Sequence, residues 1–248
     1  MKVSVCADMV YSGMPTVDAM QLIKSAGADA VEFWGSGGKD ISAIAKMSRE
    51  LELPVSVFCG PGDLISPEAP ENLPVELTKL AEICDQLNCR KLISISGRPQ
   101  CDWTPNNMHD RLIATVEAAI PVLEKYDLQL LLEPLNASEM PYMTSSREAF
   151  DVCRIVNNPH VAVLYDIYHM QYMEGNLINT IQANLKHISH FHVADLPGRL
   201  APGTGEINYP NIVKVLNAAK YDGYMGLEYQ PSGNKEVELK NVIGMLKN

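Results

Sequence analysis

Three carboxylates and one imidazole stand at the ends of short apolar runs in the second half of the chain. Glu133 closes the run Leu-Leu-Leu-Glu, and Asp166 closes Val-Leu-Tyr-Asp. His192 lies in His-Phe-His-Val-Ala-Asp, and Glu228 closes Met-Gly-Leu-Glu. Grouping three carboxylates without a cation costs several kcal/mol in repulsion and desolvation, and a divalent metal removes that cost. We therefore expect these four side chains to ligate Mn²⁺ or Mg²⁺, with Co²⁺ or Zn²⁺ as alternatives, leaving positions open to substrate oxygens or water.

Two residues near these runs could bind a substrate. His169 follows Asp166 at D-x-x-H spacing, which favours a role at the same site over a packing role. Arg199 lies in the glycine-rich loop that follows His192, and an arginine beside a metal site suits bidentate capture of a carboxylate. The alternatives are a surface turn for that loop and a helix-capping or ion-pairing role for each carboxylate. Glu32, which ends an apolar run, could line the site or be structural, and His190 is expected to have no chemistry.

The elements that must position these side chains follow a regular alternation along the chain. We expect strands over residues 2–7, 30–34, 54–58, 91–95, 128–132, 161–165, 189–194 and 224–227. We expect helices over 16–26, 41–51, 73–87, 105–126, 146–156, 177–185, 210–219 and 235–246, with Thr16, Ser146 and Asn208 as N-caps. Eight such units in 248 residues predict a single (β/α)8 TIM barrel over residues 1–248, with its active site at the carboxyl ends of the strands. An open doubly wound sheet fits less well, because no GxGxxG follows the first strand.

Composition narrows the class of partner. The chain has 20 basic and 30 acidic residues, so its net charge of −10 argues against nucleic acid as a partner. No apolar stretch approaches the roughly 20 residues of a membrane span, and the first residues read as a strand and not as a signal peptide. The six cysteines form no CxxC pair and are expected to be free thiols. We expect a cytoplasmic protein with a small-molecule substrate and no membrane partner; self-association stays open.

Several segments resemble the hydroxypyruvate isomerase family, which belongs to the xylose-isomerase-like TIM barrels. They are LLEPLN (131–136), YDIYHMQYMEG (165–175), HFHVADLPGR (190–199), PGTGEINY (202–209) and GYMGLEY (223–229), with AGADAVEFW (26–34) as a weaker match. The resemblance implies an aldose–ketose type isomerase of carbohydrate and glyoxylate metabolism. It would act on a small hydroxy-keto acid and convert hydroxypyruvate to tartronate semialdehyde.

The resemblance also implies roles for single residues. Glu133 and Glu228 would be both metal ligands and proton-transfer groups, and Asp166 and His192 would complete the metal shell. The residues that would line the substrate pocket are His169, which would bind a substrate oxygen as in the related ketose 3-epimerases, Glu139 and Arg199. Proton transfer through an enediolate and a metal-assisted hydride shift both fit this set of residues.

Other activities use the same barrel mouth. A ketose 3-epimerase and an isomerase of longer 2-oxo sugar acids are the nearest alternatives, and bulky side chains that could restrict substrate size are Trp34, Phe58, Trp103 and Tyr142. An apurinic endonuclease of this barrel type would need histidines at the ends of the third and fourth strands, which read FCGPG and ISISGR. A non-catalytic barrel that binds a sugar acid would have no need of two bases.

Overall fold

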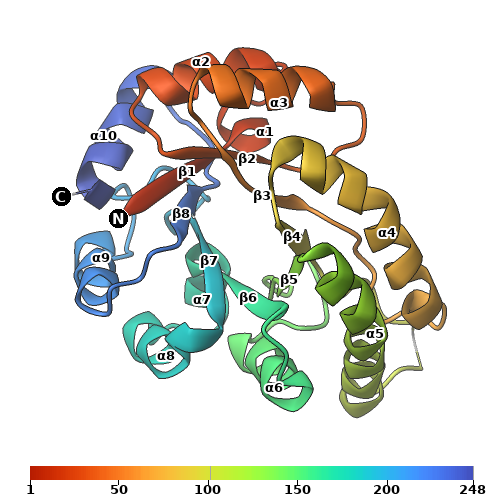
Figure 1. Ribbon diagram of the computed structural model, residues 1–248. Coiled ribbons are helices and arrows are strands. Elements are labelled where there is room, and N and C mark those ends of the chain that lie inside the picture. Colours follow the sequence, from red (N-terminus) through yellow and green to blue (C-terminus); the bar gives the residue numbers. More distant parts are fainter. Residues whose placement is uncertain (101, 248) are drawn as a thin grey trace.

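A closed barrel of parallel strands, in chain order from β1 to β8, forms the centre of the molecule (Figure 1). The computed structural model describes residues 1–100 and 102–247. The strands are β1 Lys2–Cys6, β2 Ala30–Phe33, β3 Val55–Cys59, β4 Lys91–Ser94, β5 Gln129–Leu132, β6 Val161–Asp166, β7 Ile188–Val193 and β8 Tyr224–Leu227. Pairing of β1 with β8 closes the barrel. The (β/α)8 fold expected from the sequence is confirmed.

Helices surround the barrel and cover the outer faces of its strands (Figure 1). They are α1 Ala7–Val10, α2 Thr16–Ser25, α3 Ile41–Glu50, α4 Ala69–Leu87, α5 Pro105–Tyr126, α6 Ser146–Val156, α7 Ile167–Met173, α8 Leu177–Asn184, α9 Tyr209–Ala218 and α10 Lys235–Lys247. A 3₁₀ turn, Leu185–His187, precedes β7. The short helices α1 and α7 and this turn are additions to the expected elements. Both short helices begin directly after a strand, at the end of the barrel where the acidic side chains emerge.

Alternation along each strand divides the core into two layers. Residues that point outward pack against the helices, as Phe191 and Val193 do on β7. Residues that point inward fill the barrel, where one side is a small apolar cluster of Val57, Ile93, Leu131, Ala162 and Leu164. The other side of the interior is polar, because β1, β2, β3 and β7 contribute the buried side chains Ser4, Glu32, Ser56, His190 and His192.

The helix caps differ in part from those expected. Thr16 is the first residue of α2 and does not cap it, because Pro15 occupies the cap position and no side chain bonds there. Ser146 likewise begins α6, and the cap is Ser145, whose hydroxyl accepts from the N–H of Arg147 while its own N–H donates to Glu148. Asn208 is confirmed as the cap of α9. Adjacent serines carry the same capping signal, and only the backbone conformation at each position separates them.

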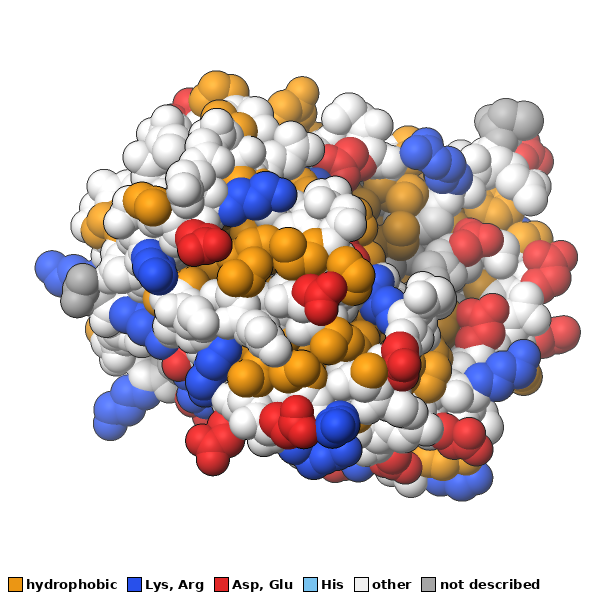
Figure 2. All heavy atoms as spheres, turned by 90° about the horizontal axis from the view of Figure 1, so that it is seen from above, with side chains coloured by type: hydrophobic (Ala, Val, Ile, Leu, Met, Phe, Trp, Pro, Cys, Tyr) orange, Lys and Arg blue, Asp and Glu red, His pale blue; other side chains and the backbone are white. Residues whose placement is uncertain are grey.

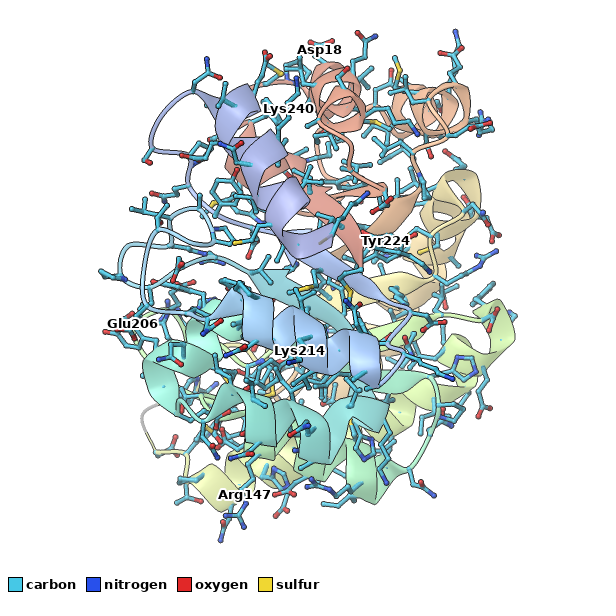
Figure 3. All side chains as sticks on the ribbon, turned by 90° about the vertical axis from the view of Figure 1, so that its left-hand side faces the viewer. Asp18, Arg147, Glu206, Lys214, Tyr224 and Lys240 are labelled. Carbon is cyan, nitrogen blue, oxygen red and sulfur yellow. The ribbon has the colours of Figure 1, made fainter. Side chains whose placement is uncertain are left out.

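The outer surface carries charges of both signs. Figure 2 shows basic and acidic side chains interspersed among neutral and apolar ones over one face of the molecule. Figure 3 looks onto α9 and α10, where Lys214 and Lys240 lie on the outside; Glu206, in the loop after β7, marks the mouth end of the barrel, and Tyr224 lies nearer the other end. Within residues 1–100 and 102–247, no helix has the length and apolar character needed to cross a membrane.

Candidate active site

The four predicted metal ligands meet at the carboxyl end of the barrel. Ligand atoms of Glu133, Asp166, His192 and Glu228 all lie within 4.8 Å of one another, and all four side chains are buried. His192 Nδ1 lies 3.2 Å from Glu133 Oε1 and 3.3 Å from Glu228 Oε2. The four residues come from the ends of β5, β6, β7 and β8, which are neighbours in the barrel. The structure therefore brings together the set that the sequence pattern singled out.

Backbone pairing holds these side chains in place. The N–H of Glu133 donates to the carbonyl of Ser94 at 3.0 Å, and the N–H of Glu228 donates to the carbonyl of Val193 at 3.1 Å. Each glutamate thus continues the ladder one residue beyond its strand. Asp166 has two tasks: its Oδ1 caps α7 by accepting from the N–H of His169 at 3.1 Å, while its Oδ2 faces the cluster. The capping role and the site role, posed as alternatives, therefore occur in one side chain.

The charged groups in the cluster lie close enough to shift one another's pKa values. Burial acts to raise the pKa of Glu228, but His192 and Arg199 outweigh it and lower that pKa to about 2. The pKa of Glu133 is raised, chiefly by burial and further by the nearby carboxylates of Glu228 and Asp166. Burial opposes the charged form of His192, yet Glu228 and the other facing glutamates raise its pKa well above the ordinary value. Among the protein groups, His192 and Arg199 supply the positive charge that three carboxylates require.

The donor set fits a divalent cation. When His192 is neutral, as an imidazole ligand must be, three carboxylates face one guanidinium, that of Arg199, and two net negative charges remain. A divalent ion balances that remainder, and three carboxylates with one imidazole are ligands that Mn²⁺ and Mg²⁺ accept. Metal binding at these residues is therefore consistent with both the charge and the chemistry of the site.

Arg199 reaches the cluster from the loop that follows β7. Its Nη2 pairs with Glu228 Oε2 and lies 3.7 Å from Asp166 Oδ2, and its Nη1 lies 3.4 Å from both oxygens of Glu139. The guanidinium also lies 5.3 Å from the centroid of the Tyr168 ring. Arg199 and Glu139 thus stand at the edge of the cluster of Glu133, Asp166, His192 and Glu228.

His169 presents one free ring nitrogen to the same space. Its Nδ1 accepts from the side-chain amide of Asn136 at 2.9 Å and from the backbone N–H of that residue at 3.3 Å. These two donors place the ring proton on Nε2. Nε2 is buried, has no hydrogen-bond partner among residues 1–100 and 102–247, and lies 3.5 Å from Asp166 Oδ2 and 3.9 Å from Glu139 Oε2. An unused donor at this position can bind a substrate oxygen.

Trp34 forms part of the site in a way that the sequence reading missed. Its indole Nε1–H donates to Glu228 Oε1 at 2.6 Å, although the indole is half exposed. Its backbone N–H donates to Asp8 at 2.6 Å, and Lys39 pairs with the same carboxylate at 3.0 Å, so the loop after β2 is tied to α1. The signal was available, because Trp34 directly follows β2 and, two residues after Glu32, falls on the same side of the chain.

Of the other bulky residues proposed to restrict the substrate, Phe58 points away from the barrel interior. Phe58 points outward from β3 and stacks on Phe33 with ring centroids 5.5 Å apart, so its assignment to the mouth is corrected. Strand alternation explains this, because its neighbour Val57 takes the inward position. Tyr142 is buried in the main apolar core, and Trp103 packs against that core with Arg111 over its ring.

Asp195 organises the loop that carries Arg199. Its Oδ1 accepts from the N–H groups of Leu196 and Ile207, both at 3.0 Å, and its Oδ2 accepts from the N–H of Gly203 at 2.7 Å. Arg199 itself has a positive φ of 56°, and its carbonyl accepts from the N–H of Gln230 at 2.8 Å. The buried carboxylate thus fixes the loop backbone, and the loop fixes the guanidinium.

Comparison with known proteins agrees with the barrel fold. The sequence model of a family described as Xylose isomerase-like TIM barrel matches residues 20–248. The chain is 36% identical over 156 residues to hydroxypyruvate isomerase of Escherichia coli, a match that covers 62% of this chain and 60% of that protein. It is 25% identical over 239 residues to 2-oxo-tetronate isomerase of Pectobacterium atrosepticum, covering 92% and 91%.

A solved structure from Brucella melitensis, titled AP endonuclease, family 2, superposes with a TM-score of 0.90 at 28% identity and covers 96% of this chain and 97% of that one. The two curated relatives carry the names of isomerases. Those names confirm the class of enzyme expected from the sequence.

Proposed function

Since the chain belongs to the xylose isomerase-like TIM barrel family, we propose that it is a metal-dependent isomerase that interconverts hydroxypyruvate and tartronate semialdehyde. The coarser class, a sugar-acid isomerase, rests on the names of the curated relatives. The observation that carries the finer proposal is the convergence of Glu133, Asp166, His192 and Glu228 within 4.8 Å in a buried cluster.

The cluster would hold one divalent cation, Mg²⁺ or Mn²⁺, through its three carboxylates and its imidazole. When bound, such a cation supplies positive charge beside the substrate carbonyl and makes the hydrogen on the neighbouring carbon more acidic. Burial of the cluster strengthens every charge interaction inside it, because little water remains to screen the charges.

Glu133 and Glu228 are the residues proposed to move protons. In hydroxypyruvate one glutamate takes a proton from C3, which leaves an enediolate spanning C2 and C3. A proton delivered to C2 by the same glutamate or its partner, with transfer of the C3 hydroxyl proton to the oxygen on C2, gives tartronate semialdehyde. The two carboxylates flank His192 at 3.2 Å and 3.3 Å, so both lie within reach of one small substrate bound between them.

Arg199, His169 and Glu139 are proposed to bind the substrate. The guanidinium of Arg199 already contacts Glu228, Glu139 and Asp166, and it can offer its two outer nitrogens to the substrate carboxylate. The free Nε2–H of His169 is suited to a hydroxyl or carbonyl oxygen. Glu139, held by Asn136 at 3.0 Å, can accept from a substrate hydroxyl.

An isomerase of 2-oxo-tetronate is the second candidate. It is favoured by the relative of that name, which the chain matches over 92% of its own length. The endonuclease title of the Brucella structure is not carried over, because β3 and β4 end in FCGPG and ISISGR, without a histidine that could hold further zinc ions. Trp34, which reaches over Glu228, is the residue placed to limit substrate length.

Proton exchange in deuterated water tests the proposal. The protein is stripped with a chelator, Mn²⁺ or Mg²⁺ is restored, and hydroxypyruvate is followed by proton NMR against a blank without enzyme. We expect metal-dependent formation of tartronate semialdehyde that carries deuterium at C2. Glu133→Gln and Glu228→Gln should each lower the rate by at least about a hundredfold, whereas the exposed Asp110→Asn should not.

Other outcomes contradict the proposal in distinct ways. Turnover of 2-oxo-tetronate at a much higher kcat/KM than hydroxypyruvate would replace the first candidate with the second. Product that retains the substrate hydrogen would indicate a hydride shift, and exchange with ketoses alone would indicate a 3-epimerase. Binding of sugar acids without exchange, with metal present, would indicate a barrel that only binds them.

A further inference from the structure

Glu32 is a buried carboxylate that joins two histidines beneath the proposed metal site. It points inward from β2 and is 1% exposed. Its Oε2 lies 2.9 Å from His190 Nε2 and accepts from the hydroxyl of Ser56 at 3.2 Å. Its Oε1 lies 3.0 Å from His192 Nε2, close enough for a hydrogen bond, although the ring N–H is turned away from the line between the two atoms. Each oxygen of Glu32 therefore faces a different imidazole.

A glycine on β8, the strand that pairs with β7, leaves space for this arrangement. Gly226 lies next to His192 in the pairing of β7 with β8. A Cβ at position 226 would lie 2.7 Å from Glu32 Oε2 and from His190 Nε2, which is too close for both atoms. The residue sits in a regular strand whose backbone does not require glycine, so the steric need is the reason for it. The small residue on β8 therefore makes room for the contact between Glu32 on β2 and the two imidazoles on β7.

Glu32 has no cationic partner other than these histidines. In the described part of the chain, its ion-pair contacts are with His190 and His192 alone, and no lysine or arginine lies within 4.0 Å. A fully buried carboxylate is costly unless it is paired and hydrogen-bonded. His190 and Ser56 both contact Oε2 of Glu32. Its Oε1 is directed at the ring of His192, whose other nitrogen faces Glu133 and Glu228.

We propose that Glu32 is a positioning residue that orients His192 for the metal. A histidine that ligates a metal typically donates its second ring N–H to a carboxylate, which fixes the tautomer and the ring angle. Glu32 faces Nε2, so the proton belongs there and Nδ1 is left to the cluster, where it lies 3.2 Å from Glu133 Oε1. His190 and Ser56 prevent the carboxylate from turning away. This inference rests on the metal site of the proposed function.

A second metal ion between Glu32, His190 and His192 is a different explanation of the same cluster. Their ligand atoms also fall within 4.8 Å of one another. His190 Nε2 and Glu32 Oε2 are hydrogen-bonded at 2.9 Å, however, and sharing His192 between two ions would require both of its ring nitrogens to be deprotonated. We therefore expect one ion per chain.

Metal affinity tests the inference without relying on activity. Mn²⁺ binding to the chelator-stripped full chain is titrated by the EPR signal of free Mn²⁺, for wild type, Glu32→Gln and the exposed control Glu117→Gln. Glutamine can accept from one imidazole but turns an N–H₂ group toward the other, so we expect Glu32→Gln to weaken binding about 10–100-fold. The control should bind as wild type does. Circular dichroism shows that each variant is folded.

A measurement on the unaltered protein covers the case in which Glu32→Gln fails to fold. Selective ¹⁵N labelling of histidine in the Mg²⁺-loaded chain should show a ring that is protonated at Nε2 and unprotonated at Nδ1 and that disappears in His192→Gln, while the Nε2-protonated ring of His169 remains. The opposite tautomer, an affinity of Glu32→Gln within threefold of wild type, or two bound ions per chain would overturn the inference. If wild type binds no Mn²⁺, the metal site of the proposed function fails instead.

Discussion

Asp195 offers a quantitative test of how the loop after β7 is built. Its carboxylate is fully buried and accepts three backbone N–H groups, from Leu196, Gly203 and Ile207. In Asp195→Asn, the amide oxygen can keep the two bonds of Oδ1, but the N–H₂ group then faces the N–H of Gly203. A lost bond to a charged acceptor is worth about 1.5–3 kcal/mol, so we expect a loss of about 2–3 kcal/mol. Asp195→Ala removes all three bonds, and we expect a loss of about 4–6 kcal/mol.

The Asp195 substitutions should lower the stability of the protein, loosen the loop after β7 and weaken substrate binding. Urea titration measures the free energy of unfolding of each variant. Hydrogen exchange measures the protection of the Gly203 and Ile207 amides, which should exchange faster in Asp195→Asn than in wild type. Because the same loop carries Arg199, KM for hydroxypyruvate should rise in parallel. Asp110→Asn, on the exposed face of α5, is the matched control and should change none of these quantities. Unchanged stability and unchanged exchange in Asp195→Asn would refute the argument.

Three further outcomes are expected. Arg199→Lys keeps the charge but cannot contact Glu139 and Glu228 together, so KM for hydroxypyruvate should rise about tenfold in steady-state assays; an unchanged KM would remove Arg199 from substrate binding. Trp34→Phe removes the indole N–H bonded to Glu228 but keeps an aromatic ring, and it should lower kcat about tenfold; a kcat equal to wild type would show that this bond is dispensable. Burial raises the pKa of Cys153 to about 12, so its thiolate fraction grows only as pH approaches 12; iodoacetamide at pH 8 should label Cys153 in urea but not in the folded chain, as judged by mass spectrometry.

The convergence of Glu133, Asp166, His192 and Glu228 could be predicted because strand ends are visible in the sequence. Parallel barrel strands read as nearly continuous apolar runs, and the first polar residue after each run lies at the mouth. Glu133 and Glu228 each follow such a run, and Asp166 ends one. Consecutive strands are neighbours in the barrel, so order along the chain gave proximity in space.

Contacts that form only when the barrel closes could not be predicted from the order of strands along the chain. Trp34 and Glu228 are 194 positions apart, and they meet only because β8 pairs with β1, which pairs with β2. Glu32 and His190 meet across the barrel interior for the same reason, and the sequence alone left Glu32 open and gave His190 no role. The helix α7 was missed because it has seven residues, too few for an amphipathic period to emerge.

The two carboxylate oxygens of Asp166 make different contacts: Oδ1 caps the N-terminus of α7, and Oδ2 faces the acidic cluster. Evolution at this position is therefore constrained twice. A neutral replacement such as asparagine could still start the helix yet would discard a charge that the centre uses, whereas glutamate would keep the charge and extend past the capping geometry. Descendants of this barrel that acquire new chemistry would be expected to vary the surrounding loops before they vary this aspartate.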